Sequence, residues 1–293
     1  MSLEADKLHT PVLLKEVIEL TSPREGDIVI DGTLGMGGHA EAFLEKIAPS
    51  GLLIGLDKSP ESIEIARRRL EGKGNFRLFN AGFEDMGRIA EELDLLGKVD
   101  IVLLDLGLSS FLLEHSGRGF SFKRDEPLDM RFDPQSGHPA SHYLNTMSQE
   151  ELARVIWEYG EERLSRRIAR KIVENRPLET TLDLVRAVEM AVPRKYWNRA
   201  LKRVFQAFRI LVNRELDVLK FALNEALRVL KPGGRLAVIS YHSLEDRIVK
   251  MFSRREDVEA ITRKPVVPSP EEVERNPRSR SAKLRVMKKV EDA

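Results

Sequence analysis

The sequence predicts an α/β fold with a mostly parallel, doubly wound sheet, into which an all-helical domain is inserted. Up to about residue 105, apolar runs of strand length alternate with amphipathic helical segments, which is the pattern of such a sheet. The alternation then stops, and residues 113–212 contain helical patterns without strands. We therefore expect residues 1–112 and 213–293 to form one discontinuous α/β domain around an inserted domain at 113–212.

The amino-acid composition excludes several classes of protein and kinds of site. The 293 residues contain no cysteine, which excludes a disulfide scaffold, a thiol nucleophile and a Cys-ligated zinc site. Neither a signal peptide nor a membrane-spanning run is recognisable, so we expect a cytoplasmic protein with no membrane partner. The net charge is +1, so any surface for nucleic acid has to be local.

Each element of the α/β part has its own signal. A short helix is predicted within residues 10–21, and Ser59 followed by Pro60 predicts the start of another. The predicted strands are residues 28–31, 52–57, 76–79, 99–105 and 235–240, with a last strand near 284–290 that has one polar face.

The inserted part begins with residues 115–145, which predict a long loop. Ser148 with Glu151 forms a capping box, and the helices that follow carry apolar stripes through Ile168 and Val188. Further caps are expected at Asn213, before a long leucine-rich helix, and at Ser243 with Asp246. The Gly119–Arg131 segment of the loop is either a lid over a substrate or a structural crossover.

A glycine-rich turn after the first strand is the centre of the predicted site. The turn matches a dinucleotide fingerprint through Gly35 and Gly37, with Asp57 about 20 residues further on. An NAD-dependent oxidoreductase is therefore an alternative. Asp31, however, precedes the turn directly, where a carboxylate favours a cationic group over a pyrophosphate. Asp31 and the Lys231–Gly234 run before the fifth strand are familiar in class I (Rossmann-like) methyltransferases, which bind the cation S-adenosylmethionine.

Eight motifs in order make the resemblance specific. They are 9–14, 31–39, 105–110, 118–122 with 127–131, 159–163, 205–210, 240–247 and 276–278. In these motifs the sequence resembles the RsmH (MraW) family of 16S ribosomal RNA cytosine-N(4) methyltransferases over almost the whole chain. The resemblance implies methyl transfer from S-adenosylmethionine to the exocyclic amine of one cytidine in the decoding region of the small ribosomal subunit.

The resemblance also implies which residues contact the cofactor. The family's contacts fall on Gly37, Gly38, His39, Asp57, Phe83, Asp105 and Leu112. The family often has a polar residue where this chain has Leu112, so a backbone contact is expected there. Taken by themselves, His39 predicts an exposed helix-start histidine and Phe83 a core aromatic, although Phe83 can also stack on adenine.

Asp105 is the main candidate for chemistry because it ends the fourth strand, at the edge where open α/β sheets bind ligands. Other amino-methyltransferases carry an Asp/Asn-Pro-Pro-Tyr/Phe motif here, whereas this chain lacks both prolines and the aromatic residue. The cytosine amine is a poor nucleophile, so direct in-line transfer needs positioning and a hydrogen-bond acceptor. We expect Asp105 or a nearby backbone carbonyl in that role, with Ser109, Ser110 and His242 as further candidates.

Basic runs predict where RNA binds. Residues 193–203 hold five basic residues and no acidic one, together with two aromatic residues, a combination suited to phosphates and unstacked bases. Residues 275–289 add seven basic residues without an acidic one. The expected RNA contacts are Arg194, Lys195, Tyr196, Trp197, Arg199, Arg203, Arg278 and Arg280.

One further alternative is a ribosome-assembly factor that binds RNA without catalysis. The intact cofactor turn and the acidic strand ends argue against it. No metal and no DNA partner are expected, and the oligomeric state is left open.

Overall fold

The computed structural model describes residues 11–108, 113 and 116–290, and these form two compact units. One unit combines the chain up to Gly107 with the chain from Val218 onward, and the other is Leu108–Asp217. The sequence-based expectation is an inserted domain at residues 113–212.

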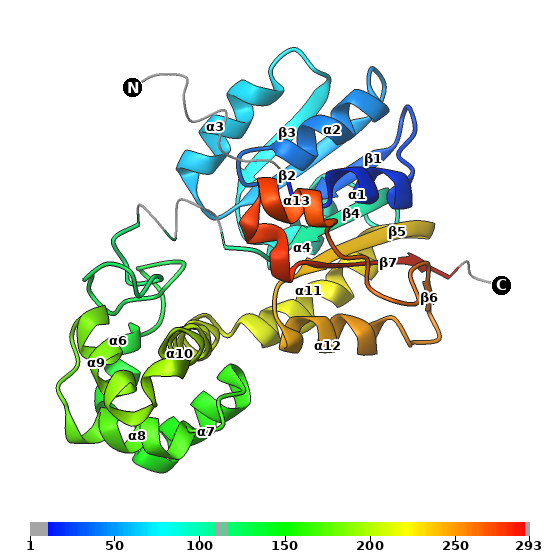
Figure 1. Ribbon diagram of the computed structural model, residues 1–293. Helices are drawn as coiled ribbons and strands as arrows, with labels where there is room; N and C mark the ends of the chain where they lie inside the picture. Colours follow the sequence, from blue (N-terminus) through cyan, green and yellow to red (C-terminus); the bar gives the residue numbers. More distant parts are fainter. Residues whose placement is uncertain (1–10, 109–112, 114–115, 291–293) are drawn as a thin grey trace. The chain divides into compact units, whose positions relative to one another are not determined.

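The first unit contains one sheet, to which the described residues contribute seven strands in the order β3-β2-β1-β4-β5-β7-β6 (Figure 1). The strands are β1 (Ile28–Asp31), β2 (Leu52–Asp57), β3 (Asn75–Asn80), β4 (Val99–Asp105), β5 (Leu230–Ser240), β6 (Val258–Ala260) and β7 (Lys283–Lys289). Strands β1 to β5 pair in parallel, whereas β7 is antiparallel to both β5 and β6. The predicted mostly parallel sheet is confirmed.

Helices cover both faces of this sheet, as expected for a doubly wound fold (Figure 1). One face carries α1 (Leu14–Thr21), α2 (Gly38–Ile47) and α3 (Pro60–Leu70), and the other carries α4 (Met86–Glu92), α11 (Glu215–Val229) and α12 (Ser243–Phe252). Alternate strand residues divide between the two faces: Ile30 and Val102 join one core, and Val29 and Leu103 the other. The predicted cap of α3 is confirmed, because Ser59 accepts a hydrogen bond from the Ser62 N–H at 3.1 Å.

Smaller elements complete this unit and correct one prediction. They are the 3-10 turn η2 (Phe83–Asp85), the helix α13 (Pro270–Arg275) and the 3-10 turn η4 (Pro277–Ser281). The prediction that the last strand has one polar face is wrong, because β7 lies between β5 and β6 and is buried on both faces. Its Arg285 is 5% exposed and donates from Nε to Asp246 Oδ1 at 2.8 Å.

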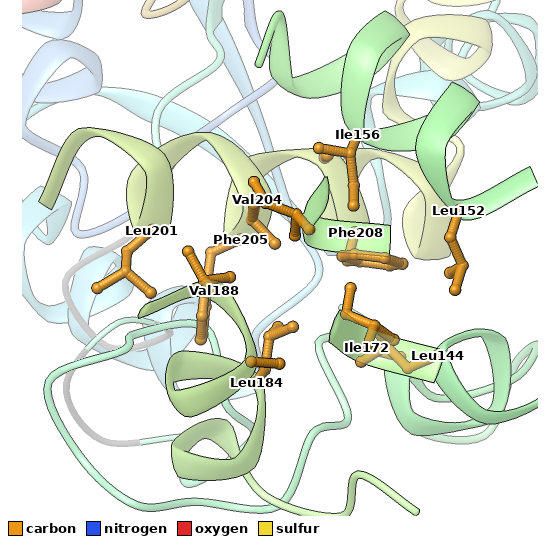
Figure 2. Packing of buried hydrophobic residues seen from close by; sticks show 14 of the residues in the cluster. Leu144, Leu152, Ile156, Ile172, Leu184, Val188, Leu201, Val204, Phe205 and Phe208 are labelled. Atoms are coloured by element: carbon orange, nitrogen blue, oxygen red, sulfur yellow. The ribbon is translucent and has the colours of Figure 1, made fainter. Parts of the chain in front are cut away.

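The second unit is helical and has a core of its own. Its elements are α6 (Ala140–Thr146), α7 (Gln149–Gly160), α8 (Ser165–Glu174), α9 (Thr181–Ala191), η3 (Arg194–Tyr196) and α10 (Trp197–Asn213). Phe205 and Phe208 of α10 lie among aliphatic side chains of the neighbouring helices, including Ile156, Ile172 and Val188 (Figure 2). The predicted apolar stripes and the predicted capping box at the start of α7 are confirmed.

Three predictions about element ends are wrong. The predicted loop 115–145 ends in α6, whose start follows Pro139. Asn213 closes α10 and does not cap the next helix; its amide donates to the Met130 carbonyl and accepts from the Phe132 N–H, both at 2.8 Å. The cap of α12 is His242, because Ser243 is already helical. In the last two cases a polar side chain has a different backbone partner from the one expected.

Candidate cofactor and substrate site

Three carboxylates stand at the carboxyl ends of neighbouring parallel strands: Asp31 on β1, Asp57 on β2 and Asp105 on β4. Asp31 is 1% exposed, and its Oδ1 accepts a hydrogen bond from the Thr33 N–H at 3.1 Å. Its Oδ2 is buried without a hydrogen-bond partner among the described residues. Burial raises the pKa of Asp31 to about 7, and the negative charges of Asp105 and Asp57 contribute.

Asp57 ties the glycine turn to the end of β2. Its Oδ2 accepts from the Gly35 N–H at 2.9 Å, and its Oδ1 accepts from the Ser59 N–H at 2.8 Å. Burial raises the pKa of Asp57, against the effect of these two hydrogen bonds. A carboxylate oxygen has further lone pairs, so ribose hydroxyls remain possible donors to this side chain.

The three glycines of the turn have different reasons for lacking a side chain. Gly35 has φ +51°, and a Cβ there would meet only the Thr33 carbonyl at 3.9 Å, so this position is open to a ligand. Gly37 has φ +80°, and a Cβ there would lie 3.2 Å from the Cβ of Ala66. At Gly38 a Cβ would lie 2.4 Å from Cγ of Pro11. Packing within the protein therefore explains Gly37 and Gly38, whereas at Gly35 the left-handed backbone favours glycine and leaves open space beside it.

His39 and Phe83 both belong to the protein interior next to this turn. His39 is 7% exposed, not exposed as its residue type alone predicts, and its Nε2 lies 2.9 Å from the Val12 carbonyl oxygen. Burial lowers the pKa of His39, so the neutral ring donates to that carbonyl and fastens the segment before α1. Phe83 is partly buried against the sheet core, and its Cβ would lie 3.0 Å from a Cβ on Gly32. Phe83 thus contributes to the core and borders the turn.

Asp105 has a partner that the sequence did not reveal. Its backbone N–H donates to Thr33 Oγ1 at 2.6 Å, which joins the end of β4 to the glycine turn. Its Oδ1 accepts a hydrogen bond from the hydroxyl of Tyr241 at 2.8 Å. Tyr241 directly follows β5, the parallel neighbour of β4, and this position at the strand end is the one signal that could have identified it.

His242, the second catalytic candidate, is engaged in the start of α12. Its Nδ1 accepts from the Glu245 N–H at 3.3 Å, while Glu245 Oε2 accepts from the N–H groups of Tyr241 and His242 at 2.8 and 3.3 Å. Nε2 lies 3.1 Å from Glu245 Oε1 without hydrogen-bond geometry. These contacts describe a helix cap, and a catalytic role for His242 stays a prediction.

The basic residues predicted to bind RNA differ in how much of each side chain is available. On η3, Arg194 lies over the Trp197 ring at 5.8 Å and Lys195 over the Tyr196 ring at 4.8 Å, and Arg194, Lys195 and Tyr196 are exposed. The Trp197 indole N–H donates to the Val192 carbonyl at 2.8 Å, so this side chain stabilises the corner between α9 and α10.

Two arginines on these elements have opposite surroundings. Arg203 Nη1 donates to the buried Glu162 carboxylate at 3.2 Å, so this half-buried side chain already has a partner within the helical unit. Arg199 is exposed on α10. Arg278 and Arg280 are exposed on η4, in the α/β unit.

Three further predicted site residues, Leu112, Ser109 and Ser110, lie outside the described residues.

The donor set fits S-adenosylmethionine. A buried carboxylate oxygen without a partner, beside two further carboxylates, makes the end of β1 strongly favourable for positive charge. An open glycine turn next to it leaves room for the rest of a nucleoside. A pyrophosphate would place further negative charge beside the same three carboxylates, which disfavours the NAD alternative.

No helix in the described part of the chain is long and apolar enough to span a membrane.

The chain is similar to known rRNA methyltransferases over nearly its full length. Residues 6–290 match the model of the MraW methylase family. Ribosomal RNA small subunit methyltransferase H of Thermotoga neapolitana is 51% identical over 292 residues, covering 97% of each chain. The protein of the same name from Dictyoglomus thermophilum is 46% identical, covering 99% of each chain. A putative rRNA methylase of Clostridium thermocellum has a distantly similar structure, with a TM-score of 0.48, 13% identity, and coverage of 97% of this chain and 100% of that one.

Proposed function

The chain belongs to the MraW methylase family, and from this we propose that it transfers a methyl group from S-adenosylmethionine to the 16S RNA of the small ribosomal subunit. The acceptor is the exocyclic 4-amino group of one cytidine in the decoding region. Bacterial small subunits are cytoplasmic, so this substrate also implies where the protein acts. The observation that carries the proposal is the buried, unpartnered carboxylate oxygen of Asp31 beside Asp57 and Asp105, which favours a cationic methyl donor.

S-adenosylmethionine, when bound, supplies an electrophilic methyl group on a sulfonium centre and leaves as the neutral thioether. Asp31 provides negative charge for it, and Gly35 provides an open backbone. Asp57 receives the ribose hydroxyls, and Phe83 borders the adenine. The backbone at Leu112, together with Gly37, Gly38 and His39, completes the binding region that the family resemblance implies.

Asp105 acts on the cytosine amine. Its Oδ1 is occupied by the Tyr241 hydroxyl, so Oδ2 is the oxygen that accepts a hydrogen bond from the amine. This bond would raise the electron density on the amine nitrogen, whose lone pair is otherwise delocalised into the ring, and would hold the nitrogen in the orientation needed for in-line transfer. With the methyl donor bound, the N–CH3 bond would form as the S–CH3 bond breaks, the electron pair of that bond would stay on sulfur, and the amine proton would pass to the Asp105 carboxylate and from there to water. Positioning therefore supplies most of the catalysis.

The helical insertion, residues 113–212 in the sequence-based division, recognises the RNA. Exposed cations and an exposed aromatic ring on η3 and the start of α10 suit phosphates and an unstacked base. Arg194, Lys195, Tyr196 and Arg199 are the contacts we favour, with Arg278 and Arg280 of the α/β unit contributing further charge. Trp197 and Arg203 act through the internal contacts described above.

The experiment is methyl transfer from labelled S-adenosylmethionine to unmodified small subunits and to naked 16S RNA, followed by mapping of the modified base. Label on a single cytidine amine is the expected result. The Asp105→Asn variant should lose transfer, whereas Asp94→Asn, the same change on a side chain that is 97% exposed, should not. No label on either substrate with tight RNA binding would favour an assembly factor instead, and stabilisation by NAD alone would favour the oxidoreductase.

A further inference from the structure

Three contacts hold Tyr241, through its hydroxyl, its backbone N–H and its ring. The hydroxyl donates to Asp105 Oδ1 at 2.8 Å. The backbone N–H of the same residue donates to Glu245 Oε2 at 2.8 Å, and Glu245 is itself only 4% exposed. The ring lies against Gly107, where a Cβ would come within 2.9 Å of Cε2 and 3.0 Å of Cζ. The orientation of the phenol is therefore fixed by the start of α12 and by the lack of a side chain at position 107.

We propose that Tyr241 is a positioning residue for methyl transfer, which holds the Asp105 carboxylate so that one oxygen is free to accept from the substrate amine. This inference rests on the proposed function. The segment Asp105–Leu108 lacks the aromatic residue that other amino-methyltransferases carry there, and the ring of Tyr241, which follows the neighbouring strand, packs against this segment at Gly107. Gly107 and Tyr241 are thus complementary, since any side chain at 107 would displace the ring.

The chemistry of the pair supports a fixed donor. Burial raises the pKa of the Tyr241 hydroxyl, and the negative charge of Asp105 raises it further. The phenol consequently stays protonated at neutral pH, where it donates to the carboxylate. A carboxylate with one oxygen anchored in this way has lost rotational freedom before the substrate arrives, which reduces the entropy cost of reaching the reactive geometry.

The test compares Tyr241→Phe with the wild-type protein on small subunits. This substitution keeps the ring and its packing and removes only the hydroxyl that holds Asp105. We therefore expect kcat to fall about tenfold or more. The dissociation constant for S-adenosylmethionine, measured by calorimetry, should change less than about twofold, because the hydroxyl contacts Asp105 and not the glycine turn. Asp94→Asn is the control, since this side chain is 97% exposed and lies in the α/β unit away from the carboxyl ends of the strands.

A second variant reaches the same contact from the other side. Gly107→Ala should displace the ring and lower kcat to a similar extent, and in the Tyr241→Phe background it should cause little further loss.

The unfolding midpoint in denaturant tests the same contact without cofactor or substrate. Tyr241→Phe and Asp105→Ala should each lower this midpoint, and the double variant should lower it by less than the sum of the two single effects.

The outcomes separate this inference from the proposed function. A wild-type protein that transfers no methyl group overturns the proposed function. An active wild type whose Tyr241→Phe variant is equally fast overturns the positioning role alone. The same holds if kcat falls only in step with weaker binding of S-adenosylmethionine, or if the unfolding midpoints of Tyr241→Phe and Asp105→Ala are fully additive.

Discussion

Replacing Asp31 by asparagine should stabilise the cofactor-free protein in alkaline solution, although the residue belongs to the binding site. The carboxyl has a pKa of about 7 in the folded protein and 3.8 as its ordinary value. Between these values the folded state holds a proton that the unfolded chain has released, so stability falls as the pH rises from about 4 to about 7. A shift of this size corresponds to a loss on the order of 4 kcal/mol once the carboxylate is ionised.

Asparagine cannot ionise, so the Asp31→Asn variant should lose this slope. Guanidinium unfolding of both proteins between pH 5 and pH 8 measures the free energy of unfolding at each pH. Over this range the free energy of unfolding of the wild type should fall by about 3 kcal/mol. Asp94→Asn, which changes a fully solvated side chain, should keep the wild-type slope. The reasoning would be refuted if Asp31→Asn and the wild type lost stability in parallel between pH 5 and pH 8.

The same carboxyl should make cofactor binding depend on pH. A bound cation favours the ionised form, so binding releases the proton that Asp31 holds below pH 7. Affinity for S-adenosylmethionine should therefore weaken by up to about tenfold for each pH unit below 7 in the wild type. In Asp31→Asn the affinity should be weak at every pH and nearly independent of it. Calorimetry in buffers of different ionisation enthalpy counts the protons released.

Three further predictions concern packing and RNA. Gly38→Ala places a Cβ 2.4 Å from Pro11 Cγ and should lower the free energy of unfolding by about 1–3 kcal/mol, measured in urea; an unchanged midpoint would contradict the packing explanation. Arg285→Ala leaves the Asp246 carboxylate partly buried without its main partner and should cost about 3–5 kcal/mol, with recovery when Asp246 is also replaced by alanine. Tyr196→Ala should weaken RNA binding by about 1–3 kcal/mol in a filter assay while S-adenosylmethionine binding is unchanged; equal RNA affinity would remove the residue from the interface.

Much of the fold could be predicted because its signals are local. Strands β1, β2 and β4 are short apolar runs that end in an aspartate, and the structure assigns them the expected bounds. The cap at Ser59 and the apolar stripe through Ile168 also depend only on neighbours within a few residues. The three aspartates at the strand ends follow from the same pattern, since parallel strands bring their carboxyl ends to one edge.

The parts that could not be predicted depend on contacts between distant segments. Tyr241 and Asp105 are 136 residues apart in the sequence, and only the pairing of β4 with β5 brings them together. The burial of His39 depends on Val12, and the place of Asn213 depends on Met130 in the preceding loop. Residue type alone favours the commonest local role for each of these side chains, and tertiary contacts assign another.

The pairing of β4 with β5 also has a consequence for how the chain is made. One neighbour of β4 in the sheet, β1, precedes it, whereas the other, β5, is synthesised only after the whole Leu108–Asp217 unit. At typical translation rates this interval is on the order of ten seconds, far longer than a helix needs to form. The helical unit has its own core and can fold in that time, while β4 presents an unpaired apolar edge. A nascent chain stalled in this interval is therefore the species in which we expect association between unfinished sheets, and the helical unit would already be in its final form.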